Sequence, residues 1–391
     1  MRVLLVAATT GYQTRSFLEA ARKIGFELVL ATDRCHVLDD PWGDDAVALR
    51  FEEPEEGLET IAARGPFDGI AAVGDRPAFV ASLAAKRLGL PFSPPSAVLC
   101  ARNKFLARQR FRAEGLLTPR YELFLEPIGA RHYPCVLKPL GLSGSRGVIR
   151  ANDSAEFTAA FARIKNIAAE PSVLVEDFIP GHEYALEGIV SGGRLRTLAL
   201  FDKPDPLDGP FFEETIYVTV EIQRASEETA QRAVTALGLT QGPIHAEMRV
   251  NDAGVWMLEV AARPIGGLCS RVLRFAGGQS LEELILRHAA GEDIGEVRLE
   301  EGASAVMMIP IPRAGVYVGV SGVEDALAVR GIEDVVITAK QGQAMLPLPE
   351  GASYLGFVFS RGETPDRAVA ALRDAHARLQ FDFAAALPVV K

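Results

Sequence analysis

The chain contains 391 residues, of which 48% are hydrophobic and 24% are charged. These values are typical of a globular protein with enough core material for two or three domains. The formal net charge of −10 at pH 7 argues against a nucleic-acid partner, because phosphate backbones are bound by an excess of lysine and arginine. No apolar run approaches the roughly 20 residues that cross a bilayer, and residues 3–8 are too few for the core of a signal peptide. We therefore expect a cytoplasmic protein without a membrane partner.

The number and spacing of the cysteines also fit the reducing cytoplasm. Scattered thiols without a Cys-x-x-Cys pair fit reduced side chains better than disulfides or a structural zinc site. We expect most of them to be packing residues: Cys35, Cys100, Cys135 and Cys269.

The first 95 residues alternate apolar runs with helical patterns, which predicts an α/β domain with a parallel sheet. Residues 9–14, after the first strand, hold a single glycine, so the Gly-x-Gly-x-x-Gly dinucleotide fingerprint is absent and a dehydrogenase is disfavoured. The proline-rich residues 91–95 mark a boundary before a basic helix at 101–115 that carries Lys104. We expect strands at 3–8, 28–32 and 70–74 and a helix at 16–25.

A Gly/Ser-rich run follows a short strand that ends at Lys138. Its backbone N–H groups and hydroxyls suit phosphate oxygens, and glycine lets the backbone approach closely. The run is not a P-loop, because the lysine precedes the glycines and no Gly-Lys-Ser/Thr sequence ends it. An ordinary hairpin loop is the alternative. The candidate phosphate contacts are Gly141, Ser143, Gly144 and Ser145.

A further strand is predicted at residues 172–179. Backbone groups at such a strand end can read an adenine, and Glu183, after the turn, can accept from ribose hydroxyls. In the alternative interpretation these acids are simply solvated. The residues of this strand end are Glu176, Asp177, Phe178 and Ile179.

Residues 247–259 are typical of a tight β-hairpin. A three-residue loop with Gly254 in the left-handed position would pair Asn251 with Val255 and place Glu247 opposite Glu259. Opposed carboxylates repel, so a divalent metal between them would explain the pair. A four-residue loop would shift the register and leave two solvated acids on opposite faces. Just beyond the hairpin stand a guanidinium and a flexible glycine pair suited to anionic groups around a metal: Arg263, Gly266 and Gly267.

In order and spacing these features resemble the ATP-grasp superfamily, over most of the chain. The motifs Gly-Pro-Ile-His-Ala-Glu247 and Glu-Val-Ala-Ala-Arg-Pro-Ile-Gly-Gly267 are most similar to L-amino-acid (dipeptide) ligases. The resemblance implies a mixed α/β and α+β fold. It would contain a Rossmann-like pre-ATP-grasp domain at 1–95, a linker helix and lid at 96–180 and a catalytic domain at 181–391.

The resemblance also implies roles and cofactors, namely ATP and Mg²⁺. Lys104 and Lys138 would contact the phosphates under the Gly-rich loop, and residues 176–179 would hold adenine. Glu183 would bind the ribose. Glu247 and Glu259 would hold Mg²⁺, and Arg263 would stabilise the phosphorylated carboxylate. Arg263 and Lys138 would be the catalytic residues.

One departure concerns the second metal ion. Many relatives carry Asn two residues after the second metal-binding Glu, where this chain has Ala261. In the predicted register His245 lies opposite Ala261 on the face of both acids, so it could fill that space. The alternative is a histidine hydrogen-bonded beside the sheet. In the proline- and acid-rich residues 202–215, Glu214 could recognise an α-ammonium group, or the segment could be a solvated loop.

After Gly302 we expect strands at 305–310 and 335–339 and a helix at 367–379, with Met307 and Met308 in the core. We expect an ATP-dependent carboxylate–amine ligase that forms an amide through an acyl-phosphate and releases ADP and phosphate. The alternatives are an ATP-grasp carboxylase that uses bicarbonate and a nucleotide-binding regulatory protein. The sequence identifies neither substrate, and it leaves a homodimer open.

Overall fold

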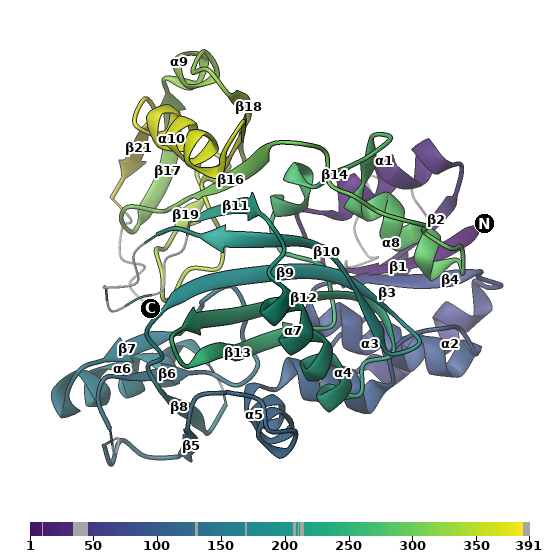
Figure 1. Cartoon of the computed structure of the whole chain (residues 1–391), viewed down its shortest axis with the longest axis horizontal. Helices are drawn as coiled ribbons and strands as arrows, with labels where there is room; N and C mark the ends of the chain where they lie inside the picture. The colour runs from purple at the N-terminus through teal and green to yellow at the C-terminus, as the bar shows by residue number, and fades with distance from the viewer. Residues whose placement is uncertain are drawn as a thin grey trace.

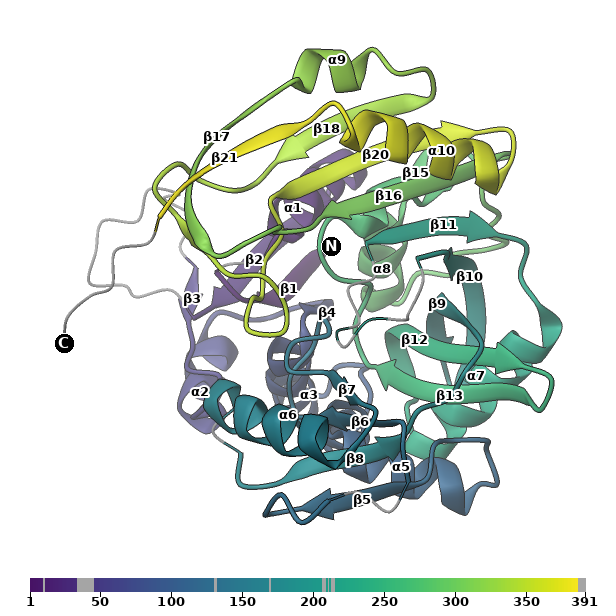
Figure 2. The same cartoon turned by 90° about the vertical axis from the view of Figure 1, so that its left-hand side faces the viewer.

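The computed structural model describes residues 1–9, 11–33, 46–129, 132–168, 170–205, 209, 211 and 215–385. The strands of these residues form five sheets. Figure 1 shows the largest sheet at the centre, the N-terminal sheet on the right and a small sheet with one helix at the lower left. Figure 2 shows the C-terminal helix and strands on the opposite side of the molecule from that small sheet.

The N-terminal sheet is parallel, as predicted, with the order β3-β2-β1-β4. Alternate residues of β1 point to opposite faces. Leu4 and Val6 pack on α2 and α3, whereas Val3 and Leu5 pack on α1 and on α8, a helix from the C-terminal half. The bounds are β1 (Arg2–Ala7), α1 (Thr14–Ile24), β2 (Glu27–Thr32), β3 (Val47–Ala48), α2 (Pro54–Ala63), β4 (Gly69–Val73), α3 (Asp75–Leu88) and α8 (Leu281–Ala289).

Two short helices lead into the second sheet, where one helix at 101–115 was predicted. The chain breaks at Asn103, whose side chain accepts hydrogen bonds from the N–H groups of Phe105 and Leu106. Such an N-cap starts a new helix, so the predicted basic helix is present but begins at Lys104 rather than at Ala101. These helices are α4 (Pro95–Arg102) and α5 (Lys104–Ala113).

The second sheet is antiparallel, in the order β5-β8-β6-β7, and one helix covers it. Phe157, Phe161 and Ile164 of that helix are buried against the sheet. We call this sheet, its helix and the Gly-rich loop between β6 and β7 the lid. Its elements are β5 (Tyr121–Phe124), β6 (Cys135–Lys138), β7 (Ile149–Ala151), α6 (Ser154–Ile167) and β8 (Val173–Asp177).

The central sheet has the order β13-β12-β9-β10-β11-β16-β20-β18. Its strands are β9 (His182–Ser191), β10 (Arg194–Lys203), β11 (Ile216–Val220), β12 (Gln241–Asn251), β13 (Gly254–Ala261), β16 (Ala303–Ile309), β18 (Ile332–Ile337) and β20 (Gly356–Gly362). Helices α7 (Arg224–Leu237) and α10 (Pro365–His376) pack against it. Met307 and Met308 are buried, as predicted, although Met308 also lines a cavity.

The remaining elements lie mainly in the C-terminal third. They are η1 (Cys269–Val272), β14 (Arg274–Phe275), β15 (Gln279–Ser280), β17 (Gly315–Ser321), α9 (Val323–Leu327), β19 (Ala344–Met345) and β21 (Gln380–Ala384). In the part of the chain that is described, no helix is both long and apolar enough to span a membrane. The domain boundaries at 95/96 and 180/181 stay predictions.

Candidate active site

The two acids chosen from the sequence face each other across the hairpin of β12 and β13. Glu247 lies opposite Glu259, as predicted. The predicted turn was wrong, however, because Asn251 pairs with Gly254 rather than with Val255. Only residues 252 and 253 therefore form the loop, and Gly254 has a φ of +124°, which favours glycine.

A β-bulge restores the predicted pairing of the acids. The register shifts by one residue between Glu247 and Met248, which leaves Leu258 without a partner on β12. Without the bulge Glu259 would point to the other face, because strand residues alternate. The carbonyl of Leu258 accepts a hydrogen bond from Arg108 Nη1 of α5. A neighbouring helix thus stabilises the bulge on which the carboxylate pair depends.

Glu247 is compensated by two cations. Lys203 Nζ lies 2.8 Å from Glu247 Oε1, and His245 Nε2 lies 3.4 Å from the same oxygen. Burial alone would raise the pKa of Glu247, but Lys203 and His245 hold it well below its usual range. Glu247 is therefore a carboxylate at neutral pH.

Lys203, at the end of β10, is a site residue that the sequence analysis missed. Its side chain is 2% exposed, and its Nζ also lies 2.8 Å from Glu183 Oε1. Arg249 Nε lies 2.9 Å from the other Glu183 oxygen. Burial would raise the pKa of Glu183, whereas Lys203 and Arg249 lower it. The lysine stands in a recognisable Asp-Lys-Pro run, but only the pairing of β10 with β9 brings it to the acids.

His245 is fixed by a second missed residue, Glu187 of β9. His245 lies opposite Ala261, as predicted, and its Nδ1 contacts Glu187 Oε1. The other Glu187 oxygen accepts from the N–H of Ile265 at 3.0 Å. Burial alone would lower the pKa of His245, but Glu187 and Glu247 raise it to about 9. The ring is therefore an imidazolium at neutral pH, with its Nε2 directed to Glu247.

The predicted phosphate lysine Lys138 is held by a buried ion-pair cluster. Its Nζ lies 2.8 Å from Glu176 Oε2, and Arg108 Nε lies 2.5 Å from Oε1. Burial would raise the pKa of Glu176, but Arg108 and Lys138 lower it to about 2. The Glu176 side chain is thus engaged inside the protein, so only its backbone is available to a base.

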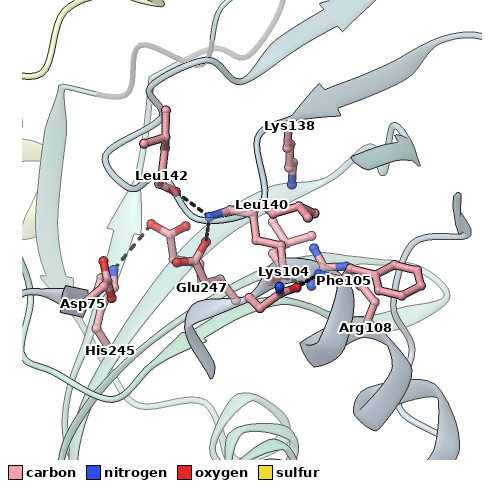
Figure 3. Close-up of polar contacts among 12 residues, drawn as sticks. Asp75, Lys104, Phe105, Arg108, Lys138, Leu140, Leu142, His245 and Glu247 are labelled. Carbon is pink, nitrogen blue, oxygen red and sulfur yellow. Dashed lines mark hydrogen bonds and ion pairs between the residues drawn. The ribbon is translucent and has the colours of Figure 1, made fainter. Parts of the chain in front are cut away.

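Lys104 joins the Gly-rich loop to the hairpin. Its Nζ donates to the carbonyl of Leu142 at 2.6 Å and lies 3.4 Å from Glu259 Oε2. Figure 3 shows its ammonium group beside the Leu142 carbonyl, with Lys138 and Glu247 bordering the same space. In this loop Gly144 has a φ of +63° and Ser145 a φ of +55°, which curls the backbone into a turn.

Arg263 is oriented by Asp75, a missed residue at the start of α3. Its Nε lies 3.2 Å from Asp75 Oδ1, and its Nη1 donates to the carbonyl of Pro264. Burial would raise the pKa of Asp75, but Arg263 and Lys104 lower it, as does a hydrogen bond from Ser143. The N-terminal sheet unit therefore contributes a charge to a site built mostly by the rest of the chain.

Most of these groups line a single cavity of about 650 Å³, a volume common for small-molecule sites. Arg108, Glu187 and Lys203 do not line it themselves but contact residues that do. Every predicted site residue that the structure describes lines it, including Asp177, Phe178 and Ile179 of the predicted adenine strand and the pair Gly266 and Gly267. Glu214 lies outside the described residues. The sequence analysis missed an apolar and aromatic part of the wall: Tyr12, Tyr217, Cys269, Met308, Ile311 and Tyr354.

Glu247 and Glu259 fit a magnesium ion that phosphate groups help to coordinate. Their side chains are 27% and 22% exposed and open to the cavity. Among the residues described, no three His, Cys, Asp or Glu side chains form a complete metal cluster. Mg²⁺ is commonly held by one or two carboxylates plus substrate phosphates, so this donor set suits an ion that arrives with a nucleotide.

Comparison with known proteins agrees with this geometry. The ATP-grasp domain family matches residues 131–272, and the L-amino acid ligase C-terminal domain 2 family matches residues 307–384. The crystal structure of an L-amino acid ligase from Bacillus licheniformis superposes with a TM-score of 0.83 at 25% identity, covering 98% of this chain and 99% of that one. The chain belongs to the ATP-grasp carboxylate–amine ligases.

Two curated relatives of this ATP-grasp ligase have similar levels of sequence identity. An uncharacterized protein, y4rH, from Sinorhizobium fredii is 24% identical over 91% of this chain and 78% of its own length. Dapdiamide A synthase from Enterobacter agglomerans is 27% identical over 46% of this chain. The match spans only 46% of that synthase.

The ATP-grasp ligase cavity favours electrostatic chemistry over covalent catalysis. Among the residues described, Cys269 is the cysteine that lines it, and burial raises the pKa of that thiol to about 12. A thiol with so high a pKa stays protonated and is a poor nucleophile. Lysines, arginine and carboxylates instead surround the space, which suits transfer of a phosphoryl group between two bound substrates.

Proposed function

We propose that the chain joins the carboxylate of one amino acid to the amine of another, using ATP and Mg²⁺. The carboxylate attacks the γ-phosphate to give an acyl-phosphate and ADP. The amine then attacks the acyl carbon and phosphate leaves, which forms the amide. The observation that carries this proposal is the pair Glu247 and Glu259, which shares one cavity with Lys104, Lys138 and Arg263.

The nucleotide would occupy the part of the cavity beneath the lid. Backbone groups of residues 176–179 would hold adenine, and Glu183 would accept from the ribose. Lys104, Lys138 and the Gly-rich loop would contact the phosphates through Gly141, Ser143, Gly144 and Ser145. These positions are supported by their common place on the cavity wall.

The metal would lie between Glu247 and Glu259, where it would neutralise phosphate oxygens. Arg263, which Asp75 orients, is placed to stabilise the charge of the phosphorylated carboxylate. The His245 imidazolium, held by Glu187, would donate a hydrogen bond to an anionic oxygen beside the metal site. The Ile265–Gly267 backbone would line the substrate part of the cavity, and Glu214 would bind the ammonium group.

Three further points belong to the proposal: the location of the enzyme, the division of its chain into functional segments and its assembly. The cavity is large enough for small molecules such as ATP and amino acids. Because these proposed substrates are abundant in the cytoplasm, we place the enzyme there. The fold is proposed to comprise functional segments at 1–95, 96–180 and 181–391. A homodimer is compatible with this arrangement.

The test is phosphate release from ATP and Mg²⁺ across L-amino acids, offered singly and in pairs, with and without bicarbonate. Release that requires two amino acids, together with a product of dipeptide mass, would support the proposal. Strict bicarbonate dependence would instead support a carboxylase. ATP binding without release under any condition would support a nucleotide-binding regulatory protein.

A further inference from the structure

A loop of the C-terminal part contacts the lid directly. Residues 346–355 connect β19 to β20, and Glu350 in this loop forms a two-point ion pair with Arg163 of the lid helix α6. Arg163 Nη2 lies 2.8 Å from Glu350 Oε2, and its Nε contacts the other oxygen. The Arg163 side chain also lies over the ring of Phe211, 4.9 Å from its centroid. Two parallel N–H to O bonds fix orientation as well as distance.

The same loop also holds the Gly-rich loop of the lid. The N–H of Gly147 donates to the carbonyl of Pro349 at 2.9 Å, and Arg146 Nε donates to the carbonyl of Glu350 at 3.2 Å. Two consecutive residues of the C-terminal part therefore engage both the lid helix and the loop predicted to cover the phosphates.

Residues 346–355, called the C-terminal loop below, are held in place by a tight turn and a buried anchor residue. The N–H of Gly351 donates to the carbonyl of Pro347 at 2.9 Å, which closes a turn. A Cβ atom at Gly351 would lie 1.9 Å from the carbonyl oxygen of Leu346, so the turn admits no larger residue. Leu355, at the end of the loop, is fully buried and donates to Ile309 at 3.0 Å.

The loop also forms part of the cavity wall, through Pro347, Leu348 and residues 351–354. The ring of Phe357 makes edge contacts with two tyrosine rings. Its centroid lies 6.0 Å from the centroid of Tyr354 and 5.3 Å from the centroid of Tyr12. One loop therefore touches both the space available to substrates and the lid that covers it.

We propose that Glu350 and Arg163 form a latch that holds the lid closed during turnover. Glu350 is a positioning residue in this proposal, which rests on the proposed function: it acts through Arg163, Arg146 and Gly147 and touches no reacting atom. Closing a lid excludes water from an activated phosphate. Loss of the latch should therefore weaken nucleotide binding and let water, rather than the amine, consume the acyl-phosphate.

The expected effect is moderate, because the side chains of Arg163 and Glu350 are 43% and 34% exposed. Ion pairs exposed to this degree contribute little, although two-point geometry adds to them. We expect about a 3- to 10-fold loss of nucleotide affinity for either single charge reversal, Arg163→Glu or Glu350→Arg. The double variant Arg163→Glu/Glu350→Arg should recover affinity to within about 2-fold of the original chain.

The measurement is binding of a non-hydrolysable ATP analogue with Mg²⁺, read by titration and by protease resistance of residues 141–147. No amino acid is present, so the result is independent of whether the proposed ligase substrates are correct. A matched control reverses the exposed pair Arg298 and Glu296, which lies outside the lid, and should leave affinity unchanged. Single variants with unchanged affinity and protection, or a double variant as weak as the singles, would overturn the latch.

A second readout separates a latch from a merely structural contact. Once a pair of substrates is known, phosphate released per amide formed should rise in Glu350→Gln, because water enters the incompletely closed site. A ratio equal to that of the original chain, despite weaker ATP binding, would contradict closure as the role of this pair.

Discussion

At the scale of residues, carboxylates of the cavity are matched by cations from other segments of the chain. Glu176 is held by Arg108 and Lys138, while Glu247 contacts Lys203. The sequence identified the acids, because turn chemistry and strand period place them. It could not identify Arg108 or Lys203 as their partners, because which strand or helix lies beside an acid is decided by tertiary packing.

Glu259→Gln should reduce phosphate release by about 100-fold or more, because it removes a charged ligand from the proposed metal site. The side chain is partly exposed, so the fold should persist, as judged by an unchanged unfolding midpoint. The control Glu296→Gln removes an equal charge from an exposed pair. A Glu259→Gln enzyme as active as this control would remove Glu259 from the metal site.

Because of Glu176, the free energy of unfolding should decrease as the pH falls below about 4.5. Its pKa falls from the usual 4.5 to about 2 in the fold, so its contribution is present above pH 4.5 and is lost as pH falls toward 2. The loss is on the order of 3 kcal/mol. Denaturant unfolding between pH 5 and pH 3 should show a steeper decline for the original chain than for Glu176→Gln. Parallel curves would contradict the assigned pKa.

At the scale of elements, the β12–β13 hairpin pairs Glu247 with Glu259 as predicted, although the turn that was predicted to produce this pairing is absent. The turn has two residues instead of three, and the bulge at Leu258 compensates for the difference. Strand period and glycine placement predicted a hairpin here, but the bulge depends on Arg108, which is 150 positions away. Most of the predicted strands and helices are present. The sequence analysis did not predict the helix break at Asn103, which depends on capping by its side chain. It also did not predict that α8 covers one face of the N-terminal sheet, because that depends on packing between distant segments.

Arg108→Met should destabilise the protein by about 3–5 kcal/mol, because Glu176 loses a buried partner. It should also lower nucleotide affinity, since the Leu258 carbonyl loses its donor and the bulge that aligns Glu259 is weakened. Chemical unfolding and titration with ATP and Mg²⁺ would measure both effects. The control is Arg232→Met, because Arg232 bonds an exposed backbone carbonyl at Glu114. Equal effects in the two variants would refute a special role for Arg108.

Gly69→Ala should test the packing of α8 on the N-terminal sheet. A Cβ atom at Gly69 would lie 2.1 Å from the carbonyl oxygen of Ala289, at the end of α8. Backbone must move to admit the methyl group, at a cost of about 1–3 kcal/mol. The unfolding free energy should fall by that amount, whereas Gly319→Ala, at a site with open space and no left-handed φ, should cost less. No loss at Gly69 would show that the helix is not packed this closely.

At the scale of the whole molecule, the site is an assembly of segments that are far apart in sequence. Asp75 comes from the N-terminal sheet unit, Lys138 from the lid, Glu247 from the central sheet and Tyr354 from the C-terminal loop. The motif order predicted the fold and the residues that line the cavity, because those residues follow recognisable local patterns. The apolar wall and the lid contacts of residues 346–355 had no such pattern, since they depend on how segments far apart in sequence pack around one cavity.

The central claim is that the substrate carboxylate attacks the γ-phosphate. The most direct measurement is to supply the carboxylate substrate labelled with ¹⁸O and to determine the label in the released phosphate by mass spectrometry. Transfer through an acyl-phosphate predicts one ¹⁸O atom in each phosphate for every amide formed. Unlabelled phosphate accompanying amide formation would contradict the account, because the carboxylate oxygen would not have become bonded to phosphorus.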